Sequence, residues 1–329
     1  MIAHRAVPWI CPALVAVLVL TGSRVLVAAD YPTQNIRIVV PFASGGGVDV
    51  VARIIVPPLS ALLGQSITIE NRGGAGGALG ANAVAQAAAD GYTLLLGTGS
   101  THGTNPSVYS KLSYDAVRDF VPIALVSASP QVLVVNPTVP AKSVKELIVL
   151  AKAKPGELAF GSYGTGSINH LAGELFNSMA DIQANHIPYR GSAPMMTDLI
   201  GGRLQYAFDG VSTTLGYIQN KTVTMLGVSG TTRSPVHPNE PTISESAVPG
   251  YDVTVWFGLF APAKTPKAVV DLLNSKMNAI LAQPEVKAGF LRLGLEPMGG
   301  GSDVLSAKVQ SEMQKWSKLV RERNIRIEQ

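Results

Sequence analysis

The residues best suited to binding chemistry lie in glycine-rich turns between β-type runs and helical patterns. Residues 41–49 contain Gly45, Gly46 and Gly47, residues 161–167 repeat the arrangement later, and residues 97–102 follow another β-type run. Glycine lets a ligand approach the backbone amides, and the following helix N-terminus adds partial positive charge. The turns at 41–49 and 161–167 could therefore bind a small anion between them, and residues 97–102 could form a further wall of this site. Taken singly, each could equally be an ordinary βα connection.

Charged side chains near these turns are candidate anchors for a ligand. Arg190 lies between Tyr189 and Gly191, and Asp209 ends a β-type run. A single charge of this kind is more often solvated than bound to a ligand. Asp49 has an equally good structural role, because a carboxylate in the first turn stabilises a helix dipole.

Catalytic and cofactor motifs are missing from the sequence. It contains no Gly-Lys pair for a phosphate-binding loop and no Gly-x-Ser-x-Gly elbow. His170 and Glu174 can share a helix face, but two residues do not make a zinc site. Apart from His4 near the N-terminus, the other histidines, at 102, 186 and 237, are scattered and are interpreted as structural. We therefore expect no catalytic residue, no metal and no cofactor.

Composition places these turns in a globular protein. The chain has 329 residues, of which 47% are hydrophobic and 15% charged, with a net charge of +4. This excludes disorder, and the length suggests about two domains. No basic stripe is present, so nucleic acid is not an expected partner.

Residues 1–29 have the pattern of an export signal that is cleaved. His4 and Arg5 precede an apolar core at 7–20, and small residues end at Ala29. The alternative is a membrane anchor, but the apolar run is shorter than the roughly 20 residues that span a bilayer. Cleavage would remove Cys11, which excludes thiol chemistry, and that cysteine lies too early for a lipid anchor. We expect a soluble, exported protein.

Strand-like and helical patterns alternate after residue 29. Strands are expected at 36–40, 67–70, 92–96, 132–135, 158–160, 204–208, 224–228 and 253–260; helices at 48–63, 78–89, 144–154, 170–179, 194–199, 266–281, 284–293 and 303–323. Pro57 and Pro58 should break or kink the first helix. Ser143 is a plausible N-cap. The pattern predicts two α/β units, each a doubly wound sheet flanked by helices.

The chain is expected to cross between these units twice, near 127–132 and 254–260. The last helices have no further strand-rich unit to cover, so they should pack back on the first unit. The predicted lobes are residues 30–128 with 255–329, and residues 129–254.

Short motifs follow one another through the mature chain. They are PFASGGGVD at 41–49, ENRGGAGG at 70–77, DGYTL at 90–94, DFVPI at 119–123, GTGS at 164–167 with His170-Leu171, PYRG at 188–191, PTISE at 241–245, PGY at 249–251 and GLFAP at 258–262. Each is weak alone, but the ordered set resembles the Bug-type substrate-binding proteins of tripartite tricarboxylate transporters. The resemblance covers essentially the whole mature chain.

This resemblance implies a periplasmic two-lobed protein, not an enzyme, that closes on a small carboxylate such as an organic, amino or aromatic acid. It implies ligand contacts at Phe42, Ala43, Gly45, Gly46, Val48 and Asp49 in one lobe, and at Thr165, Gly166, Ser167 and His170 in the other. Our candidate set adds Ser44, Thr98, Ser100, Arg190 and Asp209. Ser44, Gly47 and Gly74 are positions where the chain departs from the family pattern, and Ser44 could change ligand choice.

The implied partners are the ligand and the permease subunits of the transporter, with the binding protein itself a monomer. A sensory protein that signals to a membrane receptor is an alternative with the same architecture. A periplasmic hydrolase is a further alternative, although the sequence offers no activated nucleophile for it.

Overall fold

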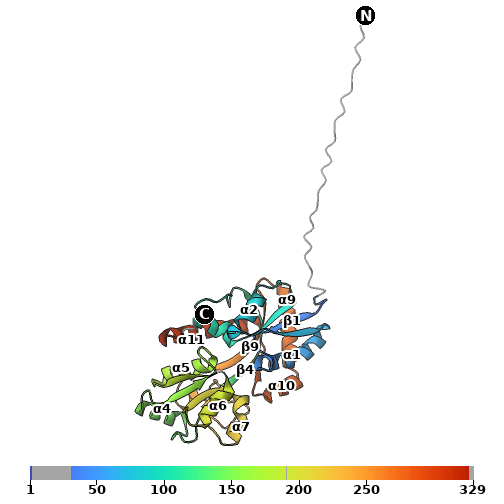
Figure 1. Cartoon of the computed structure of the whole chain (residues 1–329). Coiled ribbons are helices and arrows are strands. Elements are labelled where there is room, and N and C mark those ends of the chain that lie inside the picture. The colour runs from blue at the N-terminus through green and yellow to red at the C-terminus, as the bar shows by residue number, and fades with distance from the viewer. Residues whose placement is uncertain (2–30, 190, 326–329) are drawn as a thin grey trace.

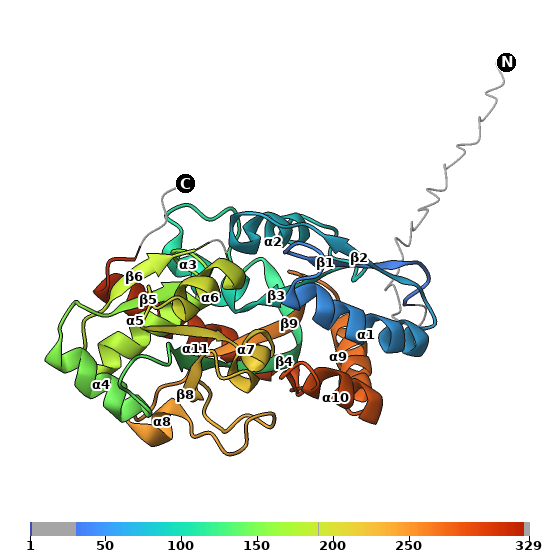
Figure 2. The ribbon, with the colours of Figure 1, turned by 60° about the horizontal axis from the view of Figure 1, so that its bottom comes forward.

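The structure is a computed structural model, and it describes residues 31–189 and 191–325, together with Met1. The expected export signal at 1–29 therefore lies outside the described residues. The strands follow one hydrogen-bonded order, β2-β1-β3-β9-β4-β7-β5-β6, with β8 and β10 also paired with β4. Figures 1 and 2 show two groups of helices and strands joined through β4 and β9. The molecule is a two-lobed α/β protein.

The first lobe is built on the parallel strands β1 (Ile36–Val40), β2 (Ile67–Asn71) and β3 (Thr93–Thr98), continued by antiparallel β9 (Thr254–Pro262) and β4 (Phe120–Val135). Helices α1 (Gly47–Leu63), α9 (Lys267–Leu281) and α10 (Pro284–Leu291) bury their apolar faces in its main hydrophobic cluster. The remaining short elements are η2 (Ala75–Gly77), α2 (Ala78–Ala85), the π-helical turn η3 (Ser100–Thr104), α3 (Asn105–Val108) and β10 (Glu296–Pro297).

The second lobe uses the end of β4, which pairs with antiparallel β7 (Tyr206–Gly210) and β8 (Thr224–Val228). Parallel strands β5 (Ala159–Ser162) and β6 (Asn185–Pro188) complete the sheet. Its helices are α4 (Val144–Ala153), α5 (Ile168–Ala180), α6 (Ser192–Ile200), α7 (Val211–Gln219) and α8 (Ile243–Ser246). Apolar residues from these elements form two clusters, one of which also receives α11 (Ser302–Glu322).

Two strands cross between the lobes, as the sequence predicted. Residues 120–130 of β4 pair with β9 in the first sheet, and residues 131–135 pair with β7 and β8 in the second. The final helix was expected to pack on the first lobe, but α11 bridges both lobes. Leu305 and Val309 join a first-lobe cluster, whereas Trp316 and Leu319 pack with residues of the second lobe. The lobe boundaries drawn from the sequence stay a prediction.

Local sequence patterns account for most elements, although β6 and α7 were not predicted. Ser143 caps α4 by accepting a hydrogen bond from the Glu146 amide, as expected. Pro57 and Pro58 do not break α1, which continues through both of them. Arg53 and Pro57 are both exposed, so solvent can hydrogen-bond the Arg53 carbonyl that loses its helical partner. In the part of the chain that the structure describes, no helix is both long and apolar enough to span a membrane.

Candidate functional site

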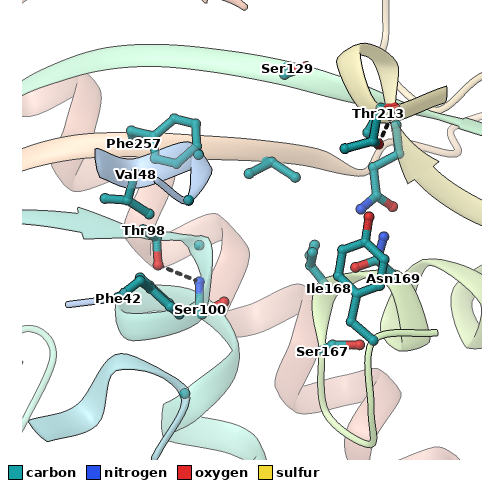
Figure 3. Close-up of a pocket in the computed structure, with 18 of the residues that line it drawn as sticks. Phe42, Val48, Thr98, Ser100, Ser129, Ser167, Ile168, Asn169, Thr213 and Phe257 are labelled. Carbon is teal, nitrogen blue, oxygen red and sulfur yellow. Dashed lines mark hydrogen bonds between the residues drawn. The ribbon is translucent and has the colours of Figure 1, made fainter. Parts of the chain in front are cut away.

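A cavity of about 780 Å³ lies between the lobes, where three helices begin. Gly47 and Val48 open α1, Ile168 and Asn169 open α5, and residues 211–213 open α7; all of them line the cavity. Figure 3 shows Phe42, Val48 and Phe257 on one side of the space and Ser167, Ile168 and Asn169 on the other. Among the described residues, no charged side chain lines the cavity. A ligand would meet amides, hydroxyls, carboxamides and apolar groups.

The structure brings nine of the candidate residues to the cavity wall: Phe42, Gly45, Gly46, Val48, Thr98, Ser100, Thr165, Gly166 and Ser167. Ala43, Ser44, Asp49, His170 and Asp209 do not line it. Arg190 lies outside the described residues. The role of each residue in ligand binding stays a prediction.

Asp49 stabilises the first-lobe turn, at residues 41–49, through hydrogen bonds to its side chain. Its buried carboxylate accepts hydrogen bonds from the Gly45 amide at 2.9 Å and from Asn71 Nδ2 at 3.0 Å, and it pairs with Arg53 Nε at 2.8 Å. Ser44 Oγ donates to the same carboxylate at 3.3 Å. The hydrogen bonds from Arg53 and Gly45 keep the pKa of Asp49 well below its usual range. The Gly45 amide is thus bonded within the protein, whereas the amides of Gly47 and Val48 at the start of α1 have no intrahelical acceptor and can bind a ligand.

His170 holds the second-lobe turn in a corresponding way. The Gly166 amide donates to His170 Nδ1 at 3.1 Å, and the His170 amide donates to Ser167 Oγ at 3.3 Å. Burial, together with the ring of His186 stacked 3.7 Å away, lowers the pKa of His170 to about 3. The ring is therefore neutral, and its Nδ1 accepts the amide hydrogen. As in the first lobe, a residue four positions on engages a glycine amide. Because the His170 amide is bonded to Ser167 Oγ, the amides of Ile168 and Asn169 are those left to bind a ligand.

Asp209 supports the start of α7, a helix that the sequence analysis did not predict. The carboxylate is fully buried and accepts hydrogen bonds from Tyr163 Oη, from Ser192 Oγ at 2.6 Å, from the Gly210 amide at 2.6 Å and from Thr213 Oγ1 at 2.8 Å. Tyr163 and Thr213 line the cavity, so Asp209 positions cavity residues without facing the cavity itself. Helix α7 begins directly after Asp209-Gly210. The available sequence signal was a glycine that follows a β-type run, as in the turns before α1 and α5.

The apolar part of the wall also escaped the sequence analysis. Val255 and Phe257 come from β9, and Leu293 and Leu295 follow α10. These residues are far from the glycine-rich turns in sequence, and nothing in their local pattern marks them as cavity residues. Gln131, on β4 where it passes between the lobes, was likewise not identified.

Metal binding has no support in the described part of the chain, where no group of three or more His, Cys, Asp or Glu residues is placed to hold an ion. Two buried amide oxygens of cavity-lining residues do lack a hydrogen-bond partner among the described residues. They are Gln131 Oε1 and Asn169 Oδ1. A buried acceptor without a partner costs free energy, and both oxygens lie beneath the cavity surface.

Comparison with known proteins agrees with this architecture. BugT of Bordetella pertussis is 35% identical over 318 residues, which is 96% of this chain and 98% of BugT. The R. palustris protein Rpa4515, solved with adipate, superposes with a TM-score of 0.79 at 37% identity, covering 90% of this chain and 99% of the other. MatC of Rhodopseudomonas palustris, solved with bound malate, has a TM-score of 0.74 at 33% identity, covering 88% and 100% of the two chains. The family described as the tripartite tricarboxylate transporter family receptor matches residues 51–325, and this chain belongs to that family.

Proposed function

We propose that this protein captures a small carboxylate in the cavity between its lobes and delivers it to the membrane permease of a tripartite tricarboxylate-type transporter. Its family consists of periplasmic solute-binding receptors, so the chain is a binding protein and not an enzyme. Export through the signal at residues 1–29 would bring it to the periplasm.

One observation carries the carboxylate proposal: three helix N-termini converge on a cavity whose described lining holds no charged side chain. The first amides of a helix lack intrahelical acceptors and carry partial positive charge. Such amides bind carboxylates and phosphates without a lysine or arginine. The adipate and malate found with two related proteins support a carboxylate over a phosphate.

The architecture supports capture by closure of the lobes. In the part of the chain that the structure describes, β4, β9 and α11 connect the halves, and the cavity walls come from both. A ligand that contacts both walls favours the closed arrangement by its differential affinity. Small-angle scattering should therefore show a smaller radius of gyration at saturating ligand.

Binding is tested by purifying the mature protein and measuring its thermal unfolding with organic acids, amino acids and neutral sugars. Because a ligand that binds only the folded state stabilises it by mass action, at least one acid should raise the Tm, and native mass spectrometry should detect its complex. The acid should be recovered chemically unchanged. Stabilisation by a sugar or an amine, with no response to any acid, would refute the carboxylate proposal.

A further inference from the structure

One part of the first-lobe wall is polar and comes from a single stretch of chain, residues 100–109, which contains η3 and α3. Ser100, Asn105 and Tyr109 of this stretch all line the cavity. Figure 3 shows Ser100 on this wall, beside Phe42 and Thr98. The Tyr109 ring packs against a hydrophobic cluster that consists mostly of second-lobe residues. The stretch therefore faces the cavity at the place where the two lobes meet.

The carboxamide of Asn105 is held in one orientation. Its Nδ2 donates to the Gly76 carbonyl at 3.0 Å and lies 3.5 Å from Tyr114 Oη. The proton of that hydroxyl goes to the Thr101 carbonyl at 2.6 Å, so Tyr114 Oη can only accept from Asn105. Turning the carboxamide over would set Oδ1 against the Gly76 carbonyl with no proton between the two oxygens. The acceptor atom, Oδ1, is therefore fixed on the side away from these bonds.

This Oδ1 is an acceptor that a ligand can reach. The hydrogen bonds of the Asn105 side chain use Nδ2, and no described residue donates to Oδ1. Asn105 is only 3% exposed but lines the cavity. Its Oδ1 is not one of the completely enclosed unpaired atoms, in contrast to Gln131 Oε1 and Asn169 Oδ1. Since an acceptor without a partner costs free energy when it is largely desolvated, a donor on a ligand would be bound here.

The Tyr109 hydroxyl borders the same gap in the wall. A Cβ on Gly76 would lie 3.0 Å from Tyr109 Oη and 3.2 Å from Asn105 Oδ1, and Gly76 itself lines the cavity. The hydrogen bonds around this gap leave Tyr109 Oη without a partner among the described residues. Burial raises the pKa of Tyr109, so the hydroxyl keeps its proton and can donate it. The gap is thus flanked by a fixed acceptor and a free hydroxyl.

We infer that the ligand carries a hydroxyl group in addition to its carboxylate, and that Asn105 and Tyr109 select this hydroxyl. The ligand hydroxyl donates to Asn105 Oδ1 and accepts the proton of Tyr109 Oη. A second carboxylate cannot donate to Asn105 Oδ1. An ammonium group cannot accept from Tyr109, and no carboxylate in the described lining offsets its charge. The inference rests on the proposed function and narrows its ligand class to hydroxy acids.

Pairs of acids that differ by one hydroxyl test the ligand class by titration calorimetry. The pairs are lactate and propanoate, malate and succinate, citrate and tricarballylate, and mandelate and phenylacetate. In at least one pair the hydroxy acid should bind at least tenfold more tightly, because its analogue leaves both protein groups unpaired. Aspartate, which has an ammonium group in place of the hydroxyl, should bind more weakly than malate.

The outcomes separate this inference from the proposed function. If acids bind but no hydroxy acid exceeds its analogue, or if aspartate binds more tightly than malate, the inference is wrong and carboxylate binding stands. If no acid binds, either in these pairs or in the wider thermal-unfolding screen, the proposed function itself is refuted.

The role of Tyr109 is tested by a substitution that removes only its hydroxyl. Tyr109→Phe keeps the ring in its cluster, so it should bind the preferred hydroxy acid about tenfold more weakly and bind the analogue like the parent. Tyr217→Phe makes the same change at a half-buried tyrosine of α7 that does not line the cavity, and it should bind both acids like the parent. Equal losses for the two acids in Tyr109→Phe, or no loss for either, would overturn the assignment.

The gap itself is tested by filling it. Gly76→Ala places a methyl group beside both oxygens and should abolish the preference for the hydroxy acid. Gly76 has a φ of 60°, so the control is Gly156→Ala, at a φ of 75° outside the cavity with open space around it. The control imposes similar backbone strain and should keep the preference. A folded Gly76→Ala variant that still prefers the hydroxy acid at least tenfold would show that the hydroxyl does not enter this gap.

Discussion

His102 gives a quantitative prediction about stability in acid. The side chain is fully buried, its ring stacks 3.9 Å from that of Phe260, and its Nδ1 lies 2.9 Å from Thr101 Oγ1. Its Nε2 has no partner among the described residues. Burial lowers the pKa of His102 from 6.5 to about 3. Below pH 6.5 the unfolded chain therefore binds a proton at this residue that the folded protein does not, and stability falls with falling pH.

The expected size follows from the gap between the two pKa values. At pH 5.0 the unfolded histidine is mostly protonated and the folded one is neutral, which costs about 2 kcal/mol of unfolding free energy relative to pH 7.5. His102→Phe keeps a ring against Phe260 and removes the titration. Thr101 Oγ1 keeps its bonds to the Thr98 backbone, at 2.9 and 3.2 Å.

Urea unfolding of the parent and of His102→Phe at pH 7.5 and pH 5.0 measures this effect. All other titrating groups are common to both proteins, so their contributions cancel in the comparison. The variant should gain about 2 kcal/mol relative to the parent between the two pH values, whatever its stability at pH 7.5. An identical difference at both pH values would show that His102 does not fold as a buried neutral group.

Three further variants probe the supports of the cavity and of the connection between lobes. Asp209→Asn, which leaves a buried cluster of donors poorly matched, should lose about 2 kcal/mol of unfolding free energy in urea and should bind ligand more weakly. Gly166→Ala forces a side chain onto a φ of 78° and should cost about 1 kcal/mol; unchanged stability would contradict that conformation. Burial alone would raise the pKa of Glu312, but Lys315 and Lys308 hold it below its usual value. Glu312→Gln should therefore lose about 2 kcal/mol, and a loss that vanished at neutral pH would refute the ion-pair interpretation.

The sequence by itself determined most of the order of elements, though not β6 or α7, and two of the turns that could bind an anion. β-branched runs and helical periodicity are local properties, as are glycines at the end of a strand, so β1, β5, α5 and the turns before α1 and α5 could be predicted from nearby residues. The capping of α4 by Ser143 followed from the same local chemistry. The ordered motifs also indicated the family, which the comparisons confirmed.

Only the tertiary structure decided what faces the cavity. The family resemblance implied ligand contacts at Gly45 and Gly166, but the amides of these two residues are bonded to Asp49 and His170. Local patterning gave no sign of these bonds. It also gave no reason to place Leu293 beside the turn at Phe42, because their proximity arises when the chain returns to the first lobe through β9 and α10. Hydrogen bonds and apolar contacts between distant segments depend on where β4 and β9 carry the chain, and no local pattern encodes that path.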